Sequence, residues 1–428
     1  MNKIFNPKPE SWSDILKRPT QTIDDIEFTV KEIFKEVQKK GDVAVAKYTS
    51  LFDGAKFENI EVSIAEIEQA IALIPQELKS AIQLAKSNIE KFHSAQKTAK
   101  VVVETIEGVN CWQEKRPIQK IGLYIPGGTA PLFSTVLMLA VPANIAGCNE
   151  IVLCSPPDKN GNINPAILYA AHLCGVTKIV KIGGIQAIAA MTFGTESIPK
   201  VYKIFGPGNQ FVTVAKQLAT QFGVAIDMPA GPSELLIVAD DSAVPAFIAS
   251  DLLSQAEHGT DSQVILVATS KALIDEVEAA IQSQIEVLPR KAIAEKAIAN
   301  SKLIYVENDT IALELINEYG PEHFIICSKN EDYFVNNIAN AGSVFIGNYT
   351  PESAGDYASG TNHTLPTNGY AKNYSGVNLD SFTKSMTFQK ISEKGIQNIG
   401  SAIEIMAEAE GLQAHKNAVT LRLKDLKN

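Results

Sequence analysis

Arginine, histidine and cysteine are all scarce in this sequence of 428 residues, which contains four arginines, six histidines and five cysteines. Acidic residues outnumber lysine plus arginine by 48 to 38, so the net charge is -10. An acidic chain this poor in arginine is unsuited to nucleic acid or anionic membranes, and we expect neither partner. The five cysteines show no Cys-x-x-Cys spacing, which indicates buried thiols in a reducing cytoplasm. A nucleophilic cysteine is the weaker alternative, because a reactive thiol needs an electropositive, partly exposed site.

Long apolar runs are also missing. The longest run, 136–141, ends at Pro142 and is far too short to span a bilayer. The polar stretch 1–18 lacks the apolar core of a signal peptide, so we expect a cytoplasmic protein. The P-loop, H-E-x-x-H and G-x-S-x-G patterns are absent as well, which counts against kinases, zincin proteases and α/β-hydrolases.

Short apolar runs alternate with helix-like segments from residue 121 onward. The predicted strands are 121–125, 151–154, 178–182, 201–205, 235–238, 264–268, 303–306, 324–327 and 344–346. This alternation is typical of βαβ units with a parallel sheet. The sequence therefore predicts an α/β fold with two similar units, one near 121–233 and one after it.

The two ends of the chain have helical patterns. Apolar residues recur at helical spacing in 23–48 and 64–95, where Ser63 and Glu66 fit a capping box and Pro75 must break the helix. The tail 395–426 is predicted helical with an interruption at Gly411. In contrast, 349–373 is predicted to be a long loop, and loops of this length are usually functional or disordered.

Two polar pairs suit chemistry. Gln255 and His258 share a helix face and have the donors for a metal, although the motif alone favours a histidine stabilised at a helix C-terminus, since glutamine is an unusual zinc ligand. Glu322 and His323 offer two proton-transfer groups of different pKa, or else a polar turn. Their position before strand 324–327 is unusual, since ligands prefer the carboxyl edge of a parallel sheet. Either that strand is antiparallel or the site lies between domains.

Other candidates have plain structural alternatives. Asp356 and His363 in the long loop suit metal and substrate, and an Asx-turn is the alternative for Asp356. His415 lies near Glu410 on a helix stripe that is also typical of a core or interface histidine. Glycine-rich turns at 126–128 and 206–209 follow strands and suit a nucleotide, but tight turns explain them as well. His93 and His172 fall outside every motif and are predicted to be structural.

Several strings, in order along the chain, together resemble histidinol dehydrogenase. They are LYIPGG (123–128), GGIQAIAAMTFGT (183–195), FGPGN (205–209), DMPAGPSE (227–234), LLSQAEHG (252–259), GPEH (320–323), AGDYASGTNHTLPT (354–367) and EGLQAHKNAV (410–419).

The resemblance implies the residues of the site. It implies one Zn²⁺ per subunit with the ligands Gln255, His258, Asp356 and His415, and a catalytic pair, Glu322 and His323. It implies substrate contacts from the zinc ligands, His323, Ser233, His363 and Glu410. It implies contacts to the nicotinamide nucleotide NAD from Tyr124, Gln186 and Asn209.

The resemblance also implies the fold and the assembly. The fold would be two incomplete Rossmann-like domains with helical N- and C-terminal extensions, in a homodimer with shared active sites. The expected parts are an N-terminal arm (1–22), a first α/β domain with the metal and catalytic residues (23–120 and 234–376), a second Rossmann-like domain on the nucleotide side (121–233), and a helical extension that crosses to the partner subunit (377–428).

The implied reaction is the oxidation of L-histidinol through L-histidinal to L-histidine with two NAD, the last step of histidine biosynthesis. Alcohol oxidation needs a base, for which a histidine is suited near neutral pH, and we assign this role to His323. Glu322 would activate the water that adds to the aldehyde. The alternatives are a metal-dependent hydrolase using the same His/Asp/Gln set and a two-lobed binding protein.

Overall fold

The computed structural model describes residues 1–19, 24–55, 59–127 and 131–427. It divides into two units, the larger comprising Met1–Ala95 and Ile118–Phe382, and the smaller Gln96–Pro117 and Thr383–Asn428. Residues 20–22 of the expected N-terminal arm and Gly128 of the first glycine-rich turn lie outside the described residues. Within the described ranges, none of the helices has the length and apolar content needed to cross a membrane.

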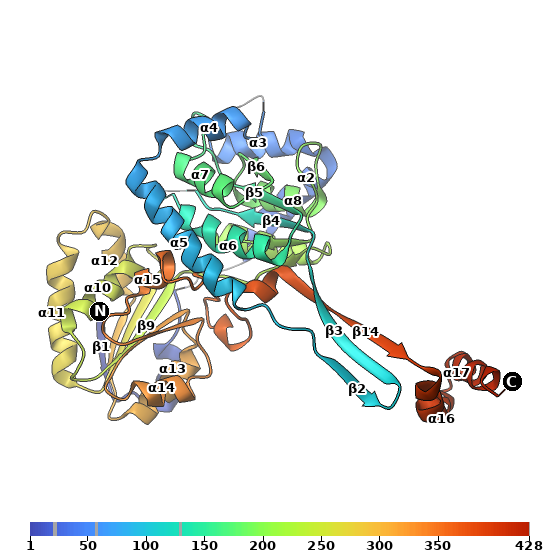
Figure 1. Ribbon diagram of the computed structural model, residues 1–428. Coiled ribbons are helices and arrows are strands. Elements are labelled where there is room, and N and C mark those ends of the chain that lie inside the picture. The colour runs from blue at the N-terminus through green and yellow to red at the C-terminus, as the bar shows by residue number, and fades with distance from the viewer. Residues whose placement is uncertain (20–23, 56–58, 128–130, 428) are drawn as a thin grey trace. The chain divides into compact units, whose positions relative to one another are not determined.

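A five-stranded parallel sheet forms the core of one half of the larger unit (Figure 1). Its strands are β4 (Lys120–Tyr124), β5 (Glu150–Cys154), β6 (Lys178–Val180), β7 (Lys203–Phe205) and β8 (Ala225–Ile226). Their spatial order is β6-β5-β4-β7-β8. The first three strands are therefore added toward one edge of the sheet and the last two toward the other edge, with the switch between β4 and β7. The carboxyl ends of the strands at such a switch point are where open α/β sheets bind ligands.

A six-stranded parallel sheet forms the core of the other half. Its strands are β1 (Asn2–Phe5), β9 (Glu234–Ala239), β10 (Gln263–Ala268), β11 (Lys302–Tyr305), β12 (His323–Cys327) and β13 (Ser343–Ile346). The order β1-β11-β10-β9-β12-β13 repeats the order of the first sheet once the added edge strand β1 is set aside. The prediction of two similar Rossmann-like α/β units is confirmed.

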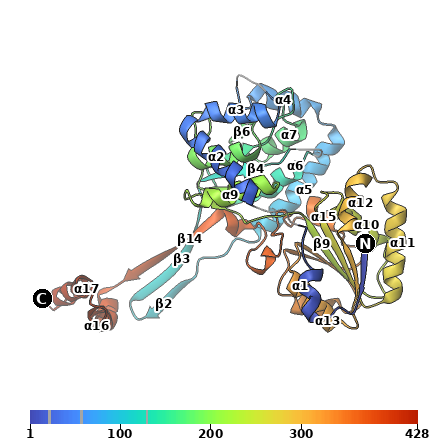
Figure 2. The ribbon, with the colours of Figure 1, turned by 180° about the vertical axis from the view of Figure 1, so that it is seen from behind.

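Helices cover both faces of the five-stranded sheet. They are α2 (Asp24–Lys40), α3 (Asp42–Phe52), α4 (Ile64–Leu73), α5 (Gln76–Ser94), α6 (Phe133–Ala146), α7 (Pro165–Leu173), α8 (Gly184–Phe193) and α9 (Gln210–Thr220). Alternate strand residues, such as Leu123 and Tyr124, enter two separate apolar cores, one with α4–α7 and one with α2, α3, α8 and α9. Figure 2 shows α2 and α9 on one face. This packing differs from the expected grouping of 23–120 with 234–376, because the apolar faces of α2–α5 are buried against the five-stranded sheet.

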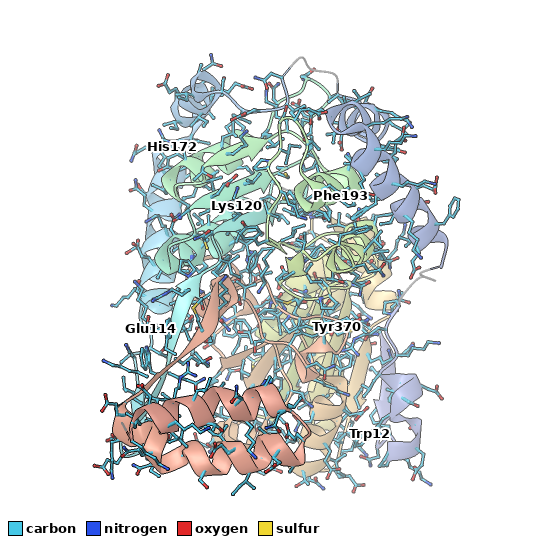
Figure 3. All side chains as sticks on the ribbon, turned by 90° about the vertical axis from the view of Figure 1, so that its right-hand side faces the viewer. Trp12, Glu114, Lys120, His172, Phe193 and Tyr370 are labelled. Atoms are coloured by element: carbon cyan, nitrogen blue, oxygen red, sulfur yellow. The ribbon has the colours of Figure 1, made fainter. Side chains whose placement is uncertain are left out.

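The six-stranded sheet is covered in the same way. Its helices are α1 (Trp12–Ile15), α10 (Pro245–Ala256), α11 (Lys271–Ile285), α12 (Lys291–Ala299), α13 (Asp309–Tyr319), α14 (Glu331–Asn337) and α15 (Glu352–Tyr357). One apolar core contains α10, α11 and α12, and the other contains α13 and Trp12, which is labelled in Figure 3. All six residues of β9 and of β10 are buried, as expected for central strands covered on both faces.

The local signals at the N-terminal helices are confirmed. Ser63 and Glu66 form the capping box that opens α4, and Pro75 separates α4 from α5. The helix predicted at 23–48 is divided between α2 and α3 at Gly41, which has a φ of +52° that favours glycine.

The smaller unit contains an antiparallel sheet as well as helices. Its strands are β2 (Val102–Ile106), β3 (Val109–Pro117) and β14 (Thr383–Ile391), and its helices are α16 (Glu393–Ala409) and α17 (Gln413–Asp425). The expected extension 377–428 is therefore helical only after residue 392. Strand β14 pairs with β3 along its full length, and Trp112 stacks on Phe388 with ring centroids 5.4 Å apart.

His93 on α5 is buried, and its Nδ1 is 2.9 Å from the carbonyl oxygen of Ile89. Burial lowers the pKa of His93. Because the unfolded chain then binds the proton more tightly, we expect the free energy of unfolding to decrease as the pH falls through about 6.5, by at most about 1.4 kcal/mol per pH unit. Urea unfolding of the wild type and of His93→Leu across this range measures the effect, which the variant should lose. The exposed His172, which lies on α7 and is labelled in Figure 3, supplies the control His172→Gln; an equal loss there would contradict the assignment.

Candidate active site

The amino ends of β9 and β12 bring together the residues expected to transfer protons. Glu322 lies directly before β12, His323 begins this strand, and Glu234 begins the neighbouring strand β9. The two strands are parallel, with His323 opposite Leu235. The alternative of a local antiparallel strand is therefore wrong, and the cluster lies at the amino edge of its sheet.

His323 is held by the backbone and surrounded by carboxylates. Its Nδ1–H donates to the carbonyl oxygen of Glu234 over 3.1 Å, which leaves the lone pair of the neutral ring on Nε2. Nε2 is buried without a hydrogen-bond partner among the described residues and lies 3.8 Å from Oδ1 of Asp356. Burial lowers the pKa of His323, but the carboxylates of Glu322, Glu352 and Asp356 outweigh it and raise the pKa to about 10.

Glu322 is buried, and its Oε2 accepts a hydrogen bond of 2.8 Å from the backbone N–H of Glu234. Burial raises the pKa of this carboxyl to about 8, against the opposing effects of His323 and of the hydrogen bond. A carboxyl with a pKa near the working pH is suited to accept a proton from water.

The short helix α15 supplies two more carboxylates from the segment predicted to be a loop. Glu352 and Asp356 are one turn apart and therefore point to the same side. Burial raises the pKa of Glu352 well above its ordinary range. The pKa of Asp356 is lowered, because the contacts with His323, His363 and His258 outweigh its burial. Sequence reasoning missed Glu352, and the four-residue spacing to Asp356 was the available signal.

The expected metal ligands of the larger unit converge on this cluster. Gln255 is buried near the end of α10, and in the orientation that satisfies its amide, the nitrogen donates to Oε2 of Glu352 over 3.3 Å. His258 follows the helix and remains exposed, yet the protein around it lowers its pKa by desolvation. A second possible donor set overlaps the expected one, because ligand atoms of His323, Glu352 and Asp356 lie within 4.8 Å of one another.

A cavity of about 390 Å³ borders this cluster, and its walls come from both halves of the larger unit. It is lined by the expected nucleotide contact Asn209, the expected substrate contacts Ser233, His258 and His363, and the expected catalytic residue Glu322. The ring of His363 is fixed at both nitrogens, by the carbonyl oxygen of Asp356 at 2.9 Å and by the hydroxyl of Thr135 at 3.0 Å. A position between the two sheets accounts for a site at the amino edge of one of them.

Glu410 and His415 belong to the smaller unit. Glu410 ends α16 and His415 lies in the first turn of α17, and both side chains are exposed. Val419, one turn after His415, is buried, whereas Leu412 is 43% exposed. His415 is therefore not a core histidine of this chain.

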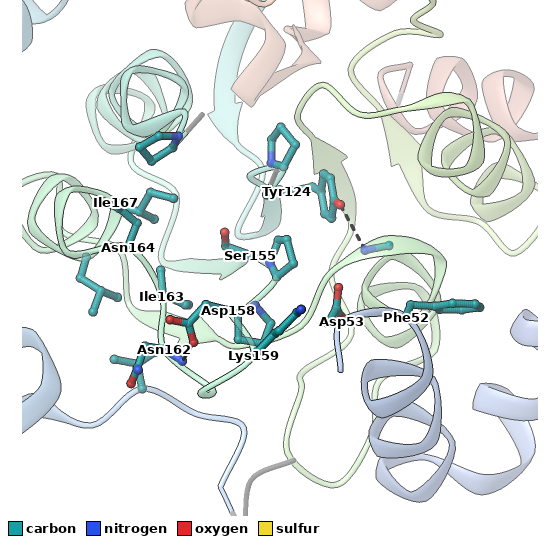
Figure 4. Close-up of a pocket in the computed structure, with 18 of the residues that line it drawn as sticks. Phe52, Asp53, Tyr124, Ser155, Asp158, Lys159, Asn162, Ile163, Asn164 and Ile167 are labelled. Atoms are coloured by element: carbon teal, nitrogen blue, oxygen red, sulfur yellow. Dashed lines mark hydrogen bonds between the residues drawn. The ribbon is translucent and has the colours of Figure 1, made fainter. Parts of the chain in front are cut away.

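The residues expected to contact the nucleotide line a second, larger cavity of about 1550 Å³ (Figure 4). Tyr124 ends β4 at the switch point of the five-stranded sheet, and its hydroxyl accepts a hydrogen bond of 3.1 Å from the N–H of Gly184. Gln186 is buried on α8, 3.5 Å from Asp53. Asn209 caps α9 by accepting from the N–H of Val212. All three residues thus lie at the carboxyl edge where this fold binds ligands.

A buried ion pair fixes the turn after β7. Lys216 and Asp227 are 2.5 Å apart and almost fully buried. Lys216 donates to the carbonyl oxygen of Gly206 over 2.8 Å, and Asp227 accepts from the N–H of the same glycine over 2.8 Å. Gly206 has a φ of +126°, and a Cβ there would collide with the backbone of Tyr124. The turn that carries Asn209 is therefore rigid and requires glycine.

Comparison with known proteins identifies the family. A family model described as histidinol dehydrogenase matches residues 16–423. A histidinol dehydrogenase of Bacteroides fragilis is 60% identical over 427 residues, which cover 100% of both chains. Another, of Haemophilus influenzae, is 53% identical over 413 residues, which cover 96% of each chain. This chain belongs to the histidinol dehydrogenase family.

Solved structures agree with this assignment. The crystal structure of histidinol dehydrogenase from Elizabethkingia anophelis matches with a TM-score of 0.98 and 57% identity, covering 100% of this chain and 99% of that one. An acetylating aldehyde dehydrogenase from Geobacillus thermoglucosidasius, 14% identical with a TM-score of 0.50, covers 89% of this chain and 93% of that one and shares the fold. The histidinol dehydrogenase family consists of oxidoreductases of histidine biosynthesis, so the hydrolase and binding-protein alternatives are wrong.

Proposed function

We propose that this member of the histidinol dehydrogenase family catalyses the zinc-dependent, four-electron oxidation of L-histidinol through L-histidinal to L-histidine with two NAD. The observation that carries the proposal is the position of Asn209, which lines both cavities. The larger cavity is lined by the expected nucleotide contacts Tyr124 and Gln186, and the smaller by the expected substrate contacts. A nicotinamide that reaches Asn209 would meet a substrate held near His323.

Glu322, which lines the smaller cavity, and the buried His323 beside it suit the two oxidation steps. When bound, NAD supplies the hydride acceptor, and zinc holds and orients the imidazole and amino groups of the substrate. In the first step, Nε2 of His323 would take the hydroxyl proton, since Nδ1 is engaged with Glu234. This role needs the neutral imidazole, which a divalent cation beside the carboxylates that raise its pKa would favour. In the second step, Glu322 would remove a proton from the water that attacks the aldehyde. Burial keeps its pKa near 8, which makes it a stronger base than an ordinary carboxylate.

The donor set fits a divalent metal. Glu322, Glu352 and Asp356 surround one imidazole in a buried setting, so negative charge exceeds positive charge unless protons or a cation compensate. Zinc accepts mixed nitrogen and oxygen donors and leaves a position for substrate in catalytic sites. We propose Gln255, His258 and Asp356 as its ligands from one chain.

We propose that His415 completes this ligand set from a second copy of the chain, together with the substrate contact Glu410. Both side chains are exposed in the smaller unit. Exposed apolar side chains accompany them on α16, α17 and the turn between them, namely Ile405, Met406, Leu412 and Leu421. A surface of this kind is typical of a subunit interface and supports a homodimer. We propose a cytoplasmic location, in line with five cysteines that form no disulfide.

The stoichiometry of the reaction tests the proposal. Purified protein loaded with zinc is mixed with a limiting amount of L-histidinol and excess NAD, and reduced nicotinamide is followed by its absorbance. We expect two reduced nucleotides and one L-histidine for each L-histidinol consumed. One reduced nucleotide for each L-histidinol, with accumulation of L-histidinal, would show that the protein is a simple alcohol dehydrogenase. The absence of any absorbance change would overturn the proposal.

A further inference from the structure

Arg18 and Glu234 form a buried ion pair directly behind the proposed catalytic residues. Nε of Arg18 is 2.5 Å from Oε1 of Glu234, and its Nη2 is 2.9 Å from Oε2, so the contact is bidentate. The exposed fractions of the two side chains are 16% and 2%. The guanidinium also lies 4.0 Å from the ring centroid of Tyr319 and donates to its carbonyl oxygen. Arg18 is one of only four arginines in the chain.

Glu234 connects this pair to both proposed catalytic groups through its own backbone. Its N–H donates to the carboxylate of Glu322 over 2.8 Å, and its carbonyl oxygen accepts from Nδ1 of His323 over 3.1 Å. One residue therefore sets the position of Glu322 and selects the tautomer of His323. Any shift of the Glu234 backbone would move both groups.

The side chain of Glu234 also fixes the end of the segment that carries His363. Oε1 accepts a hydrogen bond of 2.7 Å from the N–H of Asn368. Thr367, directly before it, lines the substrate cavity and accepts a hydrogen bond from the N–H of Gly231. The bidentate contact with Arg18 leaves the Glu234 carboxylate no freedom to rotate away from this arrangement.

Stability alone is a poor explanation for this pair. Removing an arginine and a glutamate from water costs several kcal/mol for each ion, and well-packed apolar side chains often stabilise a fold as much or more. The plane of the guanidinium, however, imposes a fixed geometry on the carboxylate that an apolar pair does not.

We infer that Arg18 is a positioning residue for the reaction, which acts through Glu234 to hold Glu322 and His323 in their working geometry. This inference rests on the roles proposed for those two residues. A displacement of about 1 Å in a catalytic group can cost about 100-fold in rate. We therefore expect Arg18→Met to lower kcat about 10- to 100-fold while the KM for L-histidinol changes less than about threefold. Arg18→Lys keeps the charge without the two-point contact and should fall between Arg18→Met and the wild type.

The control is Lys3→Met, which removes the ion pairs of Lys3 with Asp275 and Glu278 on the same N-terminal segment without touching Glu234. We expect its kcat to equal that of the wild type. Thermal unfolding shows whether each variant folds. If Arg18→Met does not fold, the single variants Arg18→Lys and Glu234→Gln are measured in its place. A kcat within twofold of the wild type in folded Arg18 variants, or a rise in KM alone, would overturn the inference. If instead Glu322→Gln is fully active in both steps, the role proposed for Glu322 fails; if the wild type forms no reduced nicotinamide from L-histidinol, the proposed function fails, whatever the Arg18 variants do.

Discussion

Glu322→Gln is expected to separate the two oxidation steps. The oxidation of L-histidinol to L-histidinal needs a base for the hydroxyl proton, a role that we propose for His323, so this step should retain most of its rate. The oxidation of L-histidinal needs an activated water, and losing the general base should slow it about 100- to 10,000-fold. Each step is measured separately, with L-histidinol or L-histidinal as the starting substrate and reduced nicotinamide as the readout.

The matched control for this variant is Glu318→Gln. Glu318 lies four residues earlier, at the exposed end of α13, where it faces Lys372 at 3.5 Å. Both oxidation steps should run at wild-type rates in Glu318→Gln. Equal losses of the two steps in Glu322→Gln would contradict the water-activating role and would point to an effect on substrate binding or on the position of His323.

Local signals in the sequence predicted the elements of the fold, because they depend on neighbouring residues. The capping box at Ser63, the break at Pro75 and the alternation of short apolar runs all correspond to elements at the expected positions. The choice of sheet for α2–α5 was not predictable in this way. Their apolar faces suit either sheet, and only the complete packing decides which one they cover.

The same contrast holds in the candidate site. Residues such as His323 and Asp356 stand out through their motifs, and the structure brings them within 3.8 Å. Arg18 is 216 residues from Glu234, and no spacing rule connects the two. Glu352 appeared to belong to a polar loop, and its burial beside His323 depends on a short helix without an apolar pattern. Long-range ion pairs and buried loop residues are therefore the part of a site that a single sequence leaves open.

Replacing a metal ligand should also have a large effect on activity. The site offers two overlapping donor sets, and substitutions can distinguish them. The resemblance implies Gln255, His258, Asp356 and His415, whereas ligand atoms of His323, Glu352 and Asp356 lie within 4.8 Å of one another. His258→Asn and Glu352→Gln distinguish the two sets, since each removes a donor of one set alone. Replacing a residue that only supports a metal ligand typically lowers metal affinity roughly 10- to 100-fold. We expect His258→Asn, which removes a ligand itself, to lower zinc affinity by more than this and to abolish activity. Glu352→Gln should retain zinc.

Zinc content after dialysis, measured on the folded protein, decides between these sets. Glu257→Gln is the control, since it changes the residue beside His258 outside both donor sets. Chelation of the wild type should likewise abolish activity and leave the unfolding midpoint nearly unchanged, because the four apolar cores contain none of the proposed metal ligands. Loss of zinc in Glu352→Gln but not in His258→Asn would assign the metal to the carboxylates of α15. His323 would then be a ligand, and a different group would have to serve as the base of the first step.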